Sequence, residues 1–207
     1  MKLSDFKTLF SNRFLSLFEI QYIDRDGQPN TWQLASREKT GPKCFCGGLQ
    51  SADAVVIVPD HRERKQLVII REFRIALGGF QYGFPAGLVD PGESVEMTVK
   101  RELKEETGLT VVRHQRNSPV VFSSSGITDE SVIIAHVICD GDPSDAGNHS
   151  SEQIETLFVG KADADRLCRD DTILMDVKTW LVLSGFAASG LGWLGDDHGG
   201  RDEGRSR

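Results

Sequence analysis

The chain has 207 residues and a formal net charge of −7 at pH 7, which predicts one main domain with an added sub-domain. The negative charge argues against a protein that binds nucleic-acid duplexes, because such a protein needs a basic face to neutralise phosphates. Small phosphorylated ligands remain open, since a divalent metal can supply the missing positive charge.

The sequence contains no sign of a membrane segment or a disulfide framework. No apolar run approaches the roughly 20 residues that a spanning helix needs, and the first residues are too polar for a secretory signal. The four cysteines, Cys44, Cys46, Cys139 and Cys168, are few and scattered. Cys44 and Cys46 would supply half of a zinc site, but no second pair follows nearby. We therefore expect a cytoplasmic protein.

Residues 1–50 are expected to form a small β module. Residues 14–23 and 31–35 have the composition of two strands, and residues 24–27 give a hairpin turn signal between them. A loop rich in Gly, Pro and Cys over residues 41–48 separates this hairpin from the rest of the chain.

From residue 51 the pattern changes to α/β, and the main domain is expected to cover residues 51–188. Short apolar runs predict strands over residues 54–58 (ended by Pro59), 66–70, 109–112, 119–122, 132–138 and 154–159, with a polar turn at 61–65. Helices are expected near residues 162–168 and 173–188. The glycine-rich and charged tail, residues 189–207, is expected to be disordered.

A further helix is predicted where the apolar spacing lengthens from two to nearly four residues. Val95, Val99 and Leu103 form its buried stripe, with Ser94 as N-cap and Gly108 as C-cap. This helix and the loop before it carry the residues that indicate a function.

Three glutamates of this helix, Glu102, Glu105 and Glu106, stand at i, i+3 and i+4, so their carboxylates converge on one face. Clustered carboxylates repel one another. Mg²⁺ compensates this repulsion well, because it prefers carboxylate, carbonyl and water oxygens. The preceding loop can add a backbone carbonyl, that of Ala86. These four residues are the predicted metal ligands, although an isolated Glu-x-x-Glu-Glu is more often solvated surface.

The stretch from Gly87 to Leu109 reads glycine, five residues, glutamate, seven residues, Arg-Glu-Leu-Lys-Glu-Glu-Thr-Gly-Leu. It matches the Nudix box without a departure, so the chain resembles a Nudix hydrolase. Glu93 and Arg101 lie about two helical turns apart and are expected to form an ion pair that holds the loop on the helix. The structural positions of the box are Gly87, Glu93, Arg101 and Gly108.

The resemblance implies an α/β fold, the Nudix α/β/α sandwich with a mixed sheet, here preceded by a small antiparallel β module. In the family, the glutamates that match Glu102 and Glu106 bind the metals and the one that matches Glu105 assists. The implied substrate is a small nucleoside-diphosphate compound, and the implied cofactor is Mg²⁺, with Mn²⁺ as an alternative. The metals clamp the pyrophosphate and activate a water, whose proton a carboxylate takes.

The similarity to the ADP-ribose and nucleotide-sugar pyrophosphatases of this family covers about residues 14–188. These relatives have a catalytic glutamate in the loop before the last strand, which points to Glu152, with Glu155 behind it. Glu105, on the helix of the box, is a further catalytic candidate. The resemblance implies substrate contacts by Arg37, Arg74 and Glu130, and stacking of the base on Trp32 or Phe18.

Three implications remain open. Ser125 stands where ADP-ribose-selective members have a proline, which leaves nucleotide sugars in general as substrates. Relatives with the N-terminal module are homodimers, and we expect the same here. The alternatives are a nucleoside-triphosphate pyrophosphatase, for which residues 1–50 would be superfluous, and a dinucleotide pyrophosphatase with a zinc ribbon, for which Cys44 and Cys46 are too few. A further alternative is a non-catalytic ADP-ribose or nucleotide sensor, which would tend to lack box glutamates.

Overall fold

The structure is a computed structural model and describes residues 1–47, 51–148 and 152–190. Residues 191–207, most of the predicted tail, lie outside the described residues. The contacts divide the chain into two units of interleaved segments. Unit 1 comprises residues 1–57, 86–103 and 113–137, and unit 2 comprises residues 58–85, 104–112 and 138–207 as far as they are described.

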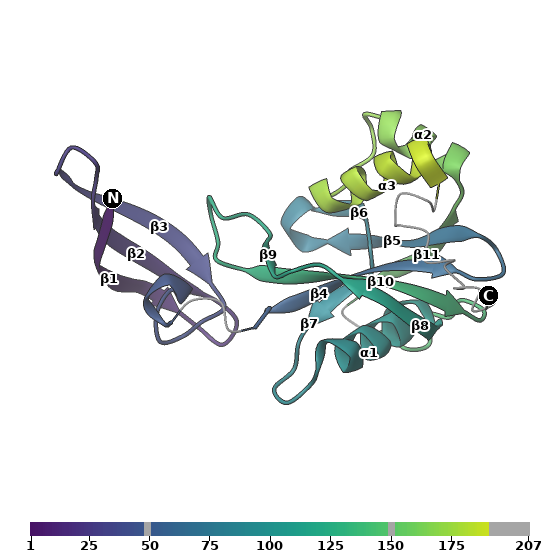
Figure 1. The fold of residues 1–207 in the computed structure, drawn as a ribbon, viewed down its shortest axis with the longest axis horizontal. Coiled ribbons are helices and arrows are strands. Elements are labelled where there is room, and N and C mark those ends of the chain that lie inside the picture. The colour runs from purple at the N-terminus through teal and green to yellow at the C-terminus, as the bar shows by residue number, and fades with distance from the viewer. Residues whose placement is uncertain (48–50, 149–151, 191–207) are drawn as a thin grey trace, which may run out of the picture. The chain divides into compact units, whose positions relative to one another are not determined.

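The N-terminal part of unit 1 is a three-stranded antiparallel sheet in the order β1-β2-β3 (Figure 1). Its strands are β1 (Lys2–Ser11), β2 (Ser16–Ile23) and β3 (Pro29–Ser36). The predicted hairpin is confirmed as β2 and β3. Their turn is held by the Asp24 carboxylate, which accepts hydrogen bonds from the backbone N–H groups of Asp26 and Gln28, both at 2.9 Å.

The first strand was not predicted, because β1 is exposed at nine of its ten positions and has no apolar alternation. Its one partly buried residue, Phe6, packs edge-on against Phe18 and also contacts Phe45. Gly41 leaves room for this ring, since a Cβ there would lie 2.7 Å from a Phe6 ring carbon. Strand β1 is therefore stabilised by backbone pairing with β2 and by one aromatic contact.

The second sheet has eight strands, in the order β11-β5-β4-β10-β8, with β6 on β5, β7 on β4 and β9 on β10. The strands are β4 (Ala54–His61), β5 (Gln66–Arg74), β6 (Gly79–Gly83), β7 (Ala86–Leu88), β8 (Thr110–Asn117), β9 (Val121–Phe122), β10 (Ser131–Asp140) and β11 (Ile154–Val159). A multi-stranded sheet with helices, preceded by a small antiparallel sheet, is the architecture that the sequence predicted.

The helices are α1 (Val95–Thr107), α2 (Lys161–Arg169) and α3 (Val177–Ser189), with short 3₁₀ turns η1 (Lys43–Phe45) and η2 (Ile75–Leu77). In unit 2, α2 and α3 pack side by side (Figure 1). Within the described ranges, no helix is both long and apolar enough to cross a membrane.

Two predicted boundaries are wrong for identifiable reasons. Strand β4 does not end before Pro59 but continues to His61. The His61 ring fixes the hairpin there, because Nδ1 accepts from the Arg64 N–H at 3.2 Å and Nε2 lies 3.0 Å from the Gly141 carbonyl oxygen. Helix α3 begins at Val177 and not at residue 173, since the Asp176 carboxylate caps it by accepting two backbone N–H groups.

Other differences concern strands without an apolar signal. Strand β8 extends to Asn117 through a polar stretch, which is tolerated because β8 is the terminal strand of the order β11-β5-β4-β10-β8 and is mostly exposed. Strands β6 and β7 are short and glycine-containing and were not predicted, and β9 is shorter than its prediction.

The predicted apolar stripe of α1 is buried at Val99 and Leu103 and half-buried at Val95. In unit 1, residues 55–57 of β4 and Val132, Ala135 and Val137 of β10 are buried as well. In unit 2 the core includes residues 67–70 of β5 and the Leu183 and Phe186 side chains of α3.

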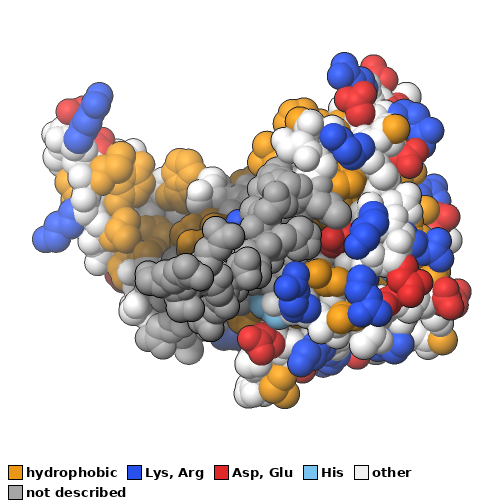
Figure 2. Space-filling model, turned by 45° about the vertical axis from the view of Figure 1, so that its right-hand side comes forward, with side chains coloured by type: hydrophobic (Ala, Val, Ile, Leu, Met, Phe, Trp, Pro, Cys, Tyr) orange, Lys and Arg blue, Asp and Glu red, His pale blue; other side chains and the backbone are white. Residues whose placement is uncertain are grey.

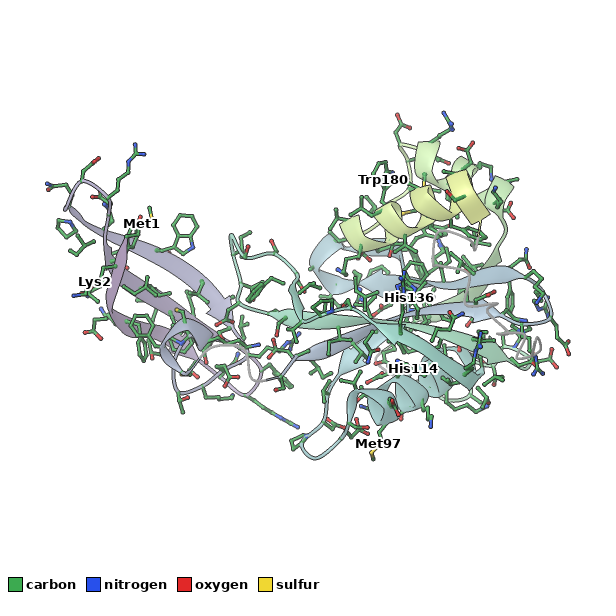
Figure 3. All side chains as sticks on the ribbon, in the orientation of Figure 1. Met1, Lys2, Met97, His114, His136 and Trp180 are labelled. Carbon is green, nitrogen blue, oxygen red and sulfur yellow. The ribbon has the colours of Figure 1, made fainter. Side chains whose placement is uncertain are left out.

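His136, on β10, makes stability depend on pH (Figure 3). Burial lowers the pKa of this imidazole to about 4, and the charge of Arg116 acts in the same direction. The unfolded chain, with a histidine pKa near 6.5, binds more protons between pH 4 and 6.5. Stability is therefore fully present above pH 6.5 and is lost as the pH falls towards 4.

We expect wild-type protein to lose about 2 kcal/mol of unfolding free energy between pH 7.5 and pH 5.0, as this pKa difference implies. Urea unfolding at the two pH values measures it. His136→Gln removes the titrating group, so its loss over this interval should be much smaller. An equal loss in both proteins would show that other groups cause the pH dependence.

Candidate active site

Helix α1 begins and ends as its sequence predicts. The Ser94 hydroxyl accepts from the Met97 N–H at 3.3 Å, and the Ser94 carbonyl accepts from Thr98 at 3.0 Å. Gly108 follows the helix with φ of +75°, a left-handed conformation that favours glycine. On the outer side of α1, Met97 points away from the sheet (Figure 3) and is 55% exposed.

Arg101 joins the loop before α1 to the helix itself. Its guanidinium donates to both carboxylate oxygens of Glu93, at 3.0 and 2.8 Å, to Glu102 at 2.6 Å and to the Leu88 carbonyl at 3.1 Å. The hydrogen bonds from Arg101, followed by one from Thr98, lower the pKa of Glu93 to about 2. The predicted Glu93–Arg101 ion pair is therefore present, and Glu93 remains ionised under ordinary conditions.

Gly87 is required by the position of Glu102. A Cβ at residue 87 would lie 1.9 Å from the carboxyl carbon and from Oε1 of Glu102. Gly87 belongs to β7, which pairs with β4 so that Gly87 lies opposite Val55 and Ala86 opposite Val56. In unit 1, then, the Glu102 carboxylate lies directly against the backbone, one residue from Ala86. These are two of the predicted metal ligands.

The other two glutamates lie in the last turn of α1, which belongs to unit 2. Because α1 is continuous, Glu106 follows Glu102 by one helical turn on the same face. The loop after β10 contacts this turn closely. The Ser144 N–H donates to the Thr107 carbonyl at 2.9 Å, and a Cβ at Gly147 would lie 2.6 Å from the Glu105 carbonyl oxygen.

The donor types fit a hard divalent cation, since α1 offers carboxylates one turn apart and Gly87 leaves space for one of them beside the backbone. Across residues 1–47, 51–148 and 152–190, no three His, Cys, Asp or Glu side chains are grouped closely enough to hold a metal ion. Glu102 pairs instead with Arg101.

In unit 2, Glu152 lies near the end of β5. Burial raises the pKa of Glu72, and the charge of Glu152 contributes to this rise while Arg74 opposes it. Glu72 and Arg74 form an ion pair at 2.9 Å, and the Phe73 N–H donates to Gln153 at 3.1 Å. Glu152 and Arg74, both predicted from the sequence, thus each lie close enough to Glu72 for their charges to act on it.

The sequence analysis did not single out Glu72 as a site residue, although its position between Arg71 and Arg74 indicates an ion pair. Glu155 is 57% exposed and pairs with Arg71 at 3.3 Å, while the Arg71 guanidinium also stacks on the Phe80 ring at 4.0 Å. Glu155 is therefore held on the strand surface by an arginine.

In unit 1, the Arg37 guanidinium donates to the Glu130 carboxylate at 2.7 Å. Strand β3, just before Arg37, also contacts the loop between β9 and β10, because the Ala35 N–H donates to the Ile127 carbonyl at 2.8 Å. Trp32 is 51% exposed on β3. Phe18 is fully buried against Phe6, so the prediction that it stacks on a base is wrong.

The predicted site residues are divided between the units. Unit 1 contains Trp32, Arg37, Ala86, Gly87, Glu93, Arg101, Glu102 and Glu130, and unit 2 contains Arg74, Glu105, Glu106, Gly108 and Glu152.

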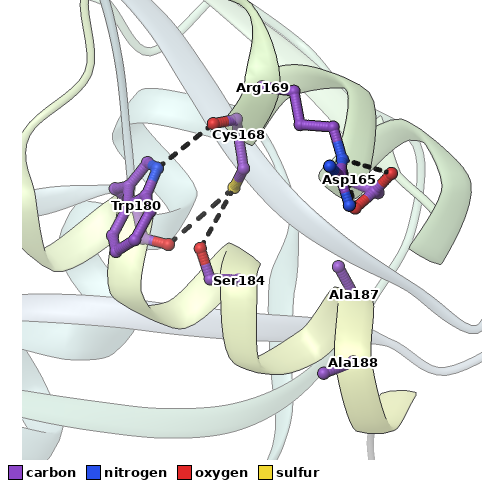
Figure 4. A pocket seen from close by; sticks show the side chains of 7 residues that line it. All are labelled: Asp165, Cys168, Arg169, Trp180, Ser184, Ala187 and Ala188. Carbon is purple, nitrogen blue, oxygen red and sulfur yellow. Dashed lines mark hydrogen bonds and ion pairs between the residues drawn. The ribbon is translucent and has the colours of Figure 1, made fainter.

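A cavity of about 460 Å³ lies between α2 and α3 in unit 2 (Figure 4). Its walls include Cys168, Trp180 and Ser184, and an Asp165–Arg169 ion pair at 3.0 Å lies beside them. None of its lining residues belongs to the predicted site, so this cavity is separate from the candidate active site.

Comparisons with known proteins agree with the geometry of the box. Residues 50–172 match the family model described as NUDIX domain. The ADP-sugar pyrophosphatase of Mus musculus is 32% identical over 173 residues, 77% of this chain and 75% of that protein. The ADP-ribose pyrophosphatase of Saccharomyces cerevisiae is 29% identical over 130 residues, 62% of this chain and 54% of that protein.

A crystal structure of an ADP compounds hydrolase superposes with a TM-score of 0.68 at 18% identity, covering 94% of this chain and 97% of that chain. At this identity the match shows the fold alone, and it confirms the predicted fold class. Hydrolases of the matched family generally use divalent metal ions.

Proposed function

Because the chain belongs to the Nudix hydrolase family, we propose that it hydrolyses the pyrophosphate bond of ADP-ribose or a related nucleoside-diphosphate sugar. The products are a nucleoside monophosphate and a sugar phosphate, and the metal is Mg²⁺, with Mn²⁺ as a substitute. The observation that carries the proposal is the assembled box, in which Arg101 joins Glu93 to Glu102 and Gly87 admits the Glu102 carboxylate. The names of the two pyrophosphatase relatives support the substrate class.

In this proposal the metal is held by the Ala86 carbonyl and by Glu102, Glu105 and Glu106. When bound, Mg²⁺ neutralises charge on the pyrophosphate and lowers the pKa of the attacking water. Glu152 accepts the proton of that water, and Glu155 is the second candidate for this role.

Two arginines bind the substrate in the proposed complex, since guanidinium groups match the oxygens of phosphate. Each is already paired with a carboxylate, Arg37 with Glu130 at 2.7 Å and Arg74 with Glu72 at 2.9 Å. These pairs restrict the arginine rotamers before substrate arrives, which reduces the entropy lost on binding.

We also propose that residues 51–188 form the hydrolase domain and that the module of residues 1–50 forms a homodimer. In addition, this module contacts the base of the substrate through Trp32. The three-stranded sheet exposes large apolar side chains, among them Leu3, Phe10 and Trp32 (Figure 2), and exposed apolar patches mark interaction sites. The four free cysteines are consistent with the proposed cytoplasmic location. Sedimentation equilibrium of the full chain tests the dimer.

A hydrolysis panel tests the function. With Mg²⁺ present, ADP-ribose and the ADP-, UDP- and GDP-sugars are expected to release nucleoside monophosphate, while nucleoside triphosphates, NADH and diadenosine polyphosphates are expected to react much more slowly. The ranking within the first group identifies the sugar and the base.

Preferred turnover of triphosphates or dinucleotides would support the alternative pyrophosphatase. Binding of ADP-ribose without turnover of any compound would support the sensor.

A further inference from the structure

Lys43 is a buried lysine in η1, the short turn that follows the N-terminal sheet. Only 8% of the residue is exposed. Its ammonium group forms an ion pair with the Asp53 carboxylate and donates to the Ser131 hydroxyl at 2.8 Å. Burying a charge is costly unless it is paired and hydrogen-bonded. The contacts with Asp53 and Ser131 therefore stabilise the buried Lys43 ammonium group in this position.

Asp53 extends this contact to the backbone of Ser131. Its carboxylate accepts from the Ser131 N–H at 2.7 Å and from the Ser131 hydroxyl at 3.0 Å. The Asp53 N–H in turn donates to the Ser131 carbonyl at 2.9 Å. Ser131 is therefore fixed through its backbone and its side chain, and both sets of contacts involve the Lys43–Asp53 pair.

Lys43 also holds the residue on the other side of Glu130. The Lys43 backbone N–H donates to Oδ2 of Asp129 at 2.9 Å. The second carboxylate oxygen, Oδ1, is buried and has no hydrogen-bond partner in the described part of the chain. Asp129 is thus held by this bond to its side chain and by its backbone N–H, which donates to the Ala35 carbonyl at 3.4 Å.

Glu130 lies between these two anchored residues, and its carboxylate pairs with Arg37 at 2.7 Å. The Arg37 side chain is 42% exposed and that of Glu130 is 26% exposed, so the pair is accessible to solvent. The residues on either side of Glu130, Asp129 and Ser131, are held by Lys43. One residue, Lys43, therefore contacts both neighbours of Glu130.

We propose that Lys43, together with Asp53, is a positioning residue that sets the Arg37–Glu130 pair for substrate binding. The inference rests on the proposed function, in which Arg37 and Glu130 contact the substrate. Lys43 touches no substrate in this scheme and acts only through its contacts with Asp53, Asp129 and Ser131. Its loss is expected to weaken substrate binding and to leave the chemical step unchanged.

The test is Lys43→Met in the full chain, with the best substrate of the panel. A displacement of the binding pair by about 1 Å is expected to raise KM about 10-fold, a smaller effect than misplacement of reacting groups causes, with kcat within about twofold of wild type. Lys39→Met is the matched control. It removes another lysine of the same connecting segment, whose ammonium contacts the Asn12 carbonyl, and it should keep the wild-type KM.

A double-mutant cycle separates positioning from general loss of structure. In an Arg37→Ala/Glu130→Ala background, Lys43→Met should raise KM no further, because both groups that it positions are already absent. Ser131→Ala is a milder variant, since it removes only the hydroxyl that bonds to both Lys43 and Asp53. It should also raise KM and show the same lack of additivity. If Lys43→Met fails to fold, Ser131→Ala decides the test. Additive effects, or a fall in kcat at unchanged KM, would overturn the proposal.

Hydrogen exchange of the ligand-free protein gives a readout that does not need turnover. The amides of residues 129–131 should lose protection in the Lys43→Met or Ser131→Ala variant, while those of α1 keep it. Unchanged protection at residues 129–131 would overturn the inference even in an active enzyme. If protection is lost but the protein hydrolyses none of the panel compounds, Lys43 does fix residues 129–131, and the proposed function is refuted instead.

Discussion

Glu106→Gln is expected to lower kcat for pyrophosphate hydrolysis by about 10²–10³-fold or more, the range found when a single charge-stabilising group is removed from an active site. Glutamine keeps the length and shape of the side chain and has a helix propensity close to that of glutamate. It does not supply the negative charge that favours Mg²⁺ binding. Hydrolysis rates over a range of Mg²⁺ concentrations, together with thermal unfolding curves, measure the effect.

The matched control is Glu96→Gln, an identical exchange in the first turn of α1 at an exposed position. It should retain wild-type rates. A near-normal rate for Glu106→Gln would refute the metal assignment. A large drop in its melting temperature would show that Glu106 acts on the fold rather than on the metal.

The helix of the site was predictable because its signals are local. The apolar spacing, the Ser94 cap, the Gly108 terminus and the Glu93–Arg101 pair all lie within 15 residues of one another, and the structure contains each of them. Helix geometry relates such residues without knowledge of the rest of the chain.

The contacts that the sequence did not predict are long-range. Lys43 meets Ser131 across 88 residues, and Arg37 meets Glu130 across 93. Neither lysine nor serine carries a pattern that indicates burial, so nothing local distinguishes Lys43 from a surface residue. The resemblance to a family supplied Arg37 and Glu130 individually, whereas the bond between them required the fold.

Strand β1 was missed for a related reason. It is stabilised by the pairing of its backbone with β2, and only Phe6 provides the apolar contact that periodicity can detect. Glu72 had a signal in its position between two arginines, but its proximity to Glu152 depends on the register of β5 with β11, where Glu72 lies opposite Ile154.

Gly87→Ala is the second change for which we expect a large effect, and here the fold should survive. The added Cβ would lie 1.9 Å from the Glu102 carboxylate. That carboxylate is the end of a flexible side chain and can move aside. Gly87 does not have a positive φ, so alanine adds no backbone strain at this position. Displacement of Glu102 is therefore the main consequence of the substitution.

Moving Glu102 breaks its 2.6 Å contact with Arg101 and removes it from the backbone beside Ala86. We expect kcat to fall about 100-fold, as a displacement of about 1 Å in an active site can cause, and the Mg²⁺ concentration for half-maximal rate to rise. Gly79→Ala is the control, because its Cβ would meet only ordinary contacts at 3.8 and 3.9 Å. If Gly87→Ala kept the wild-type rate and Mg²⁺ dependence, the position of the Glu102 carboxylate against Gly87 would be unrelated to metal binding, and Glu106 alone would carry the assignment.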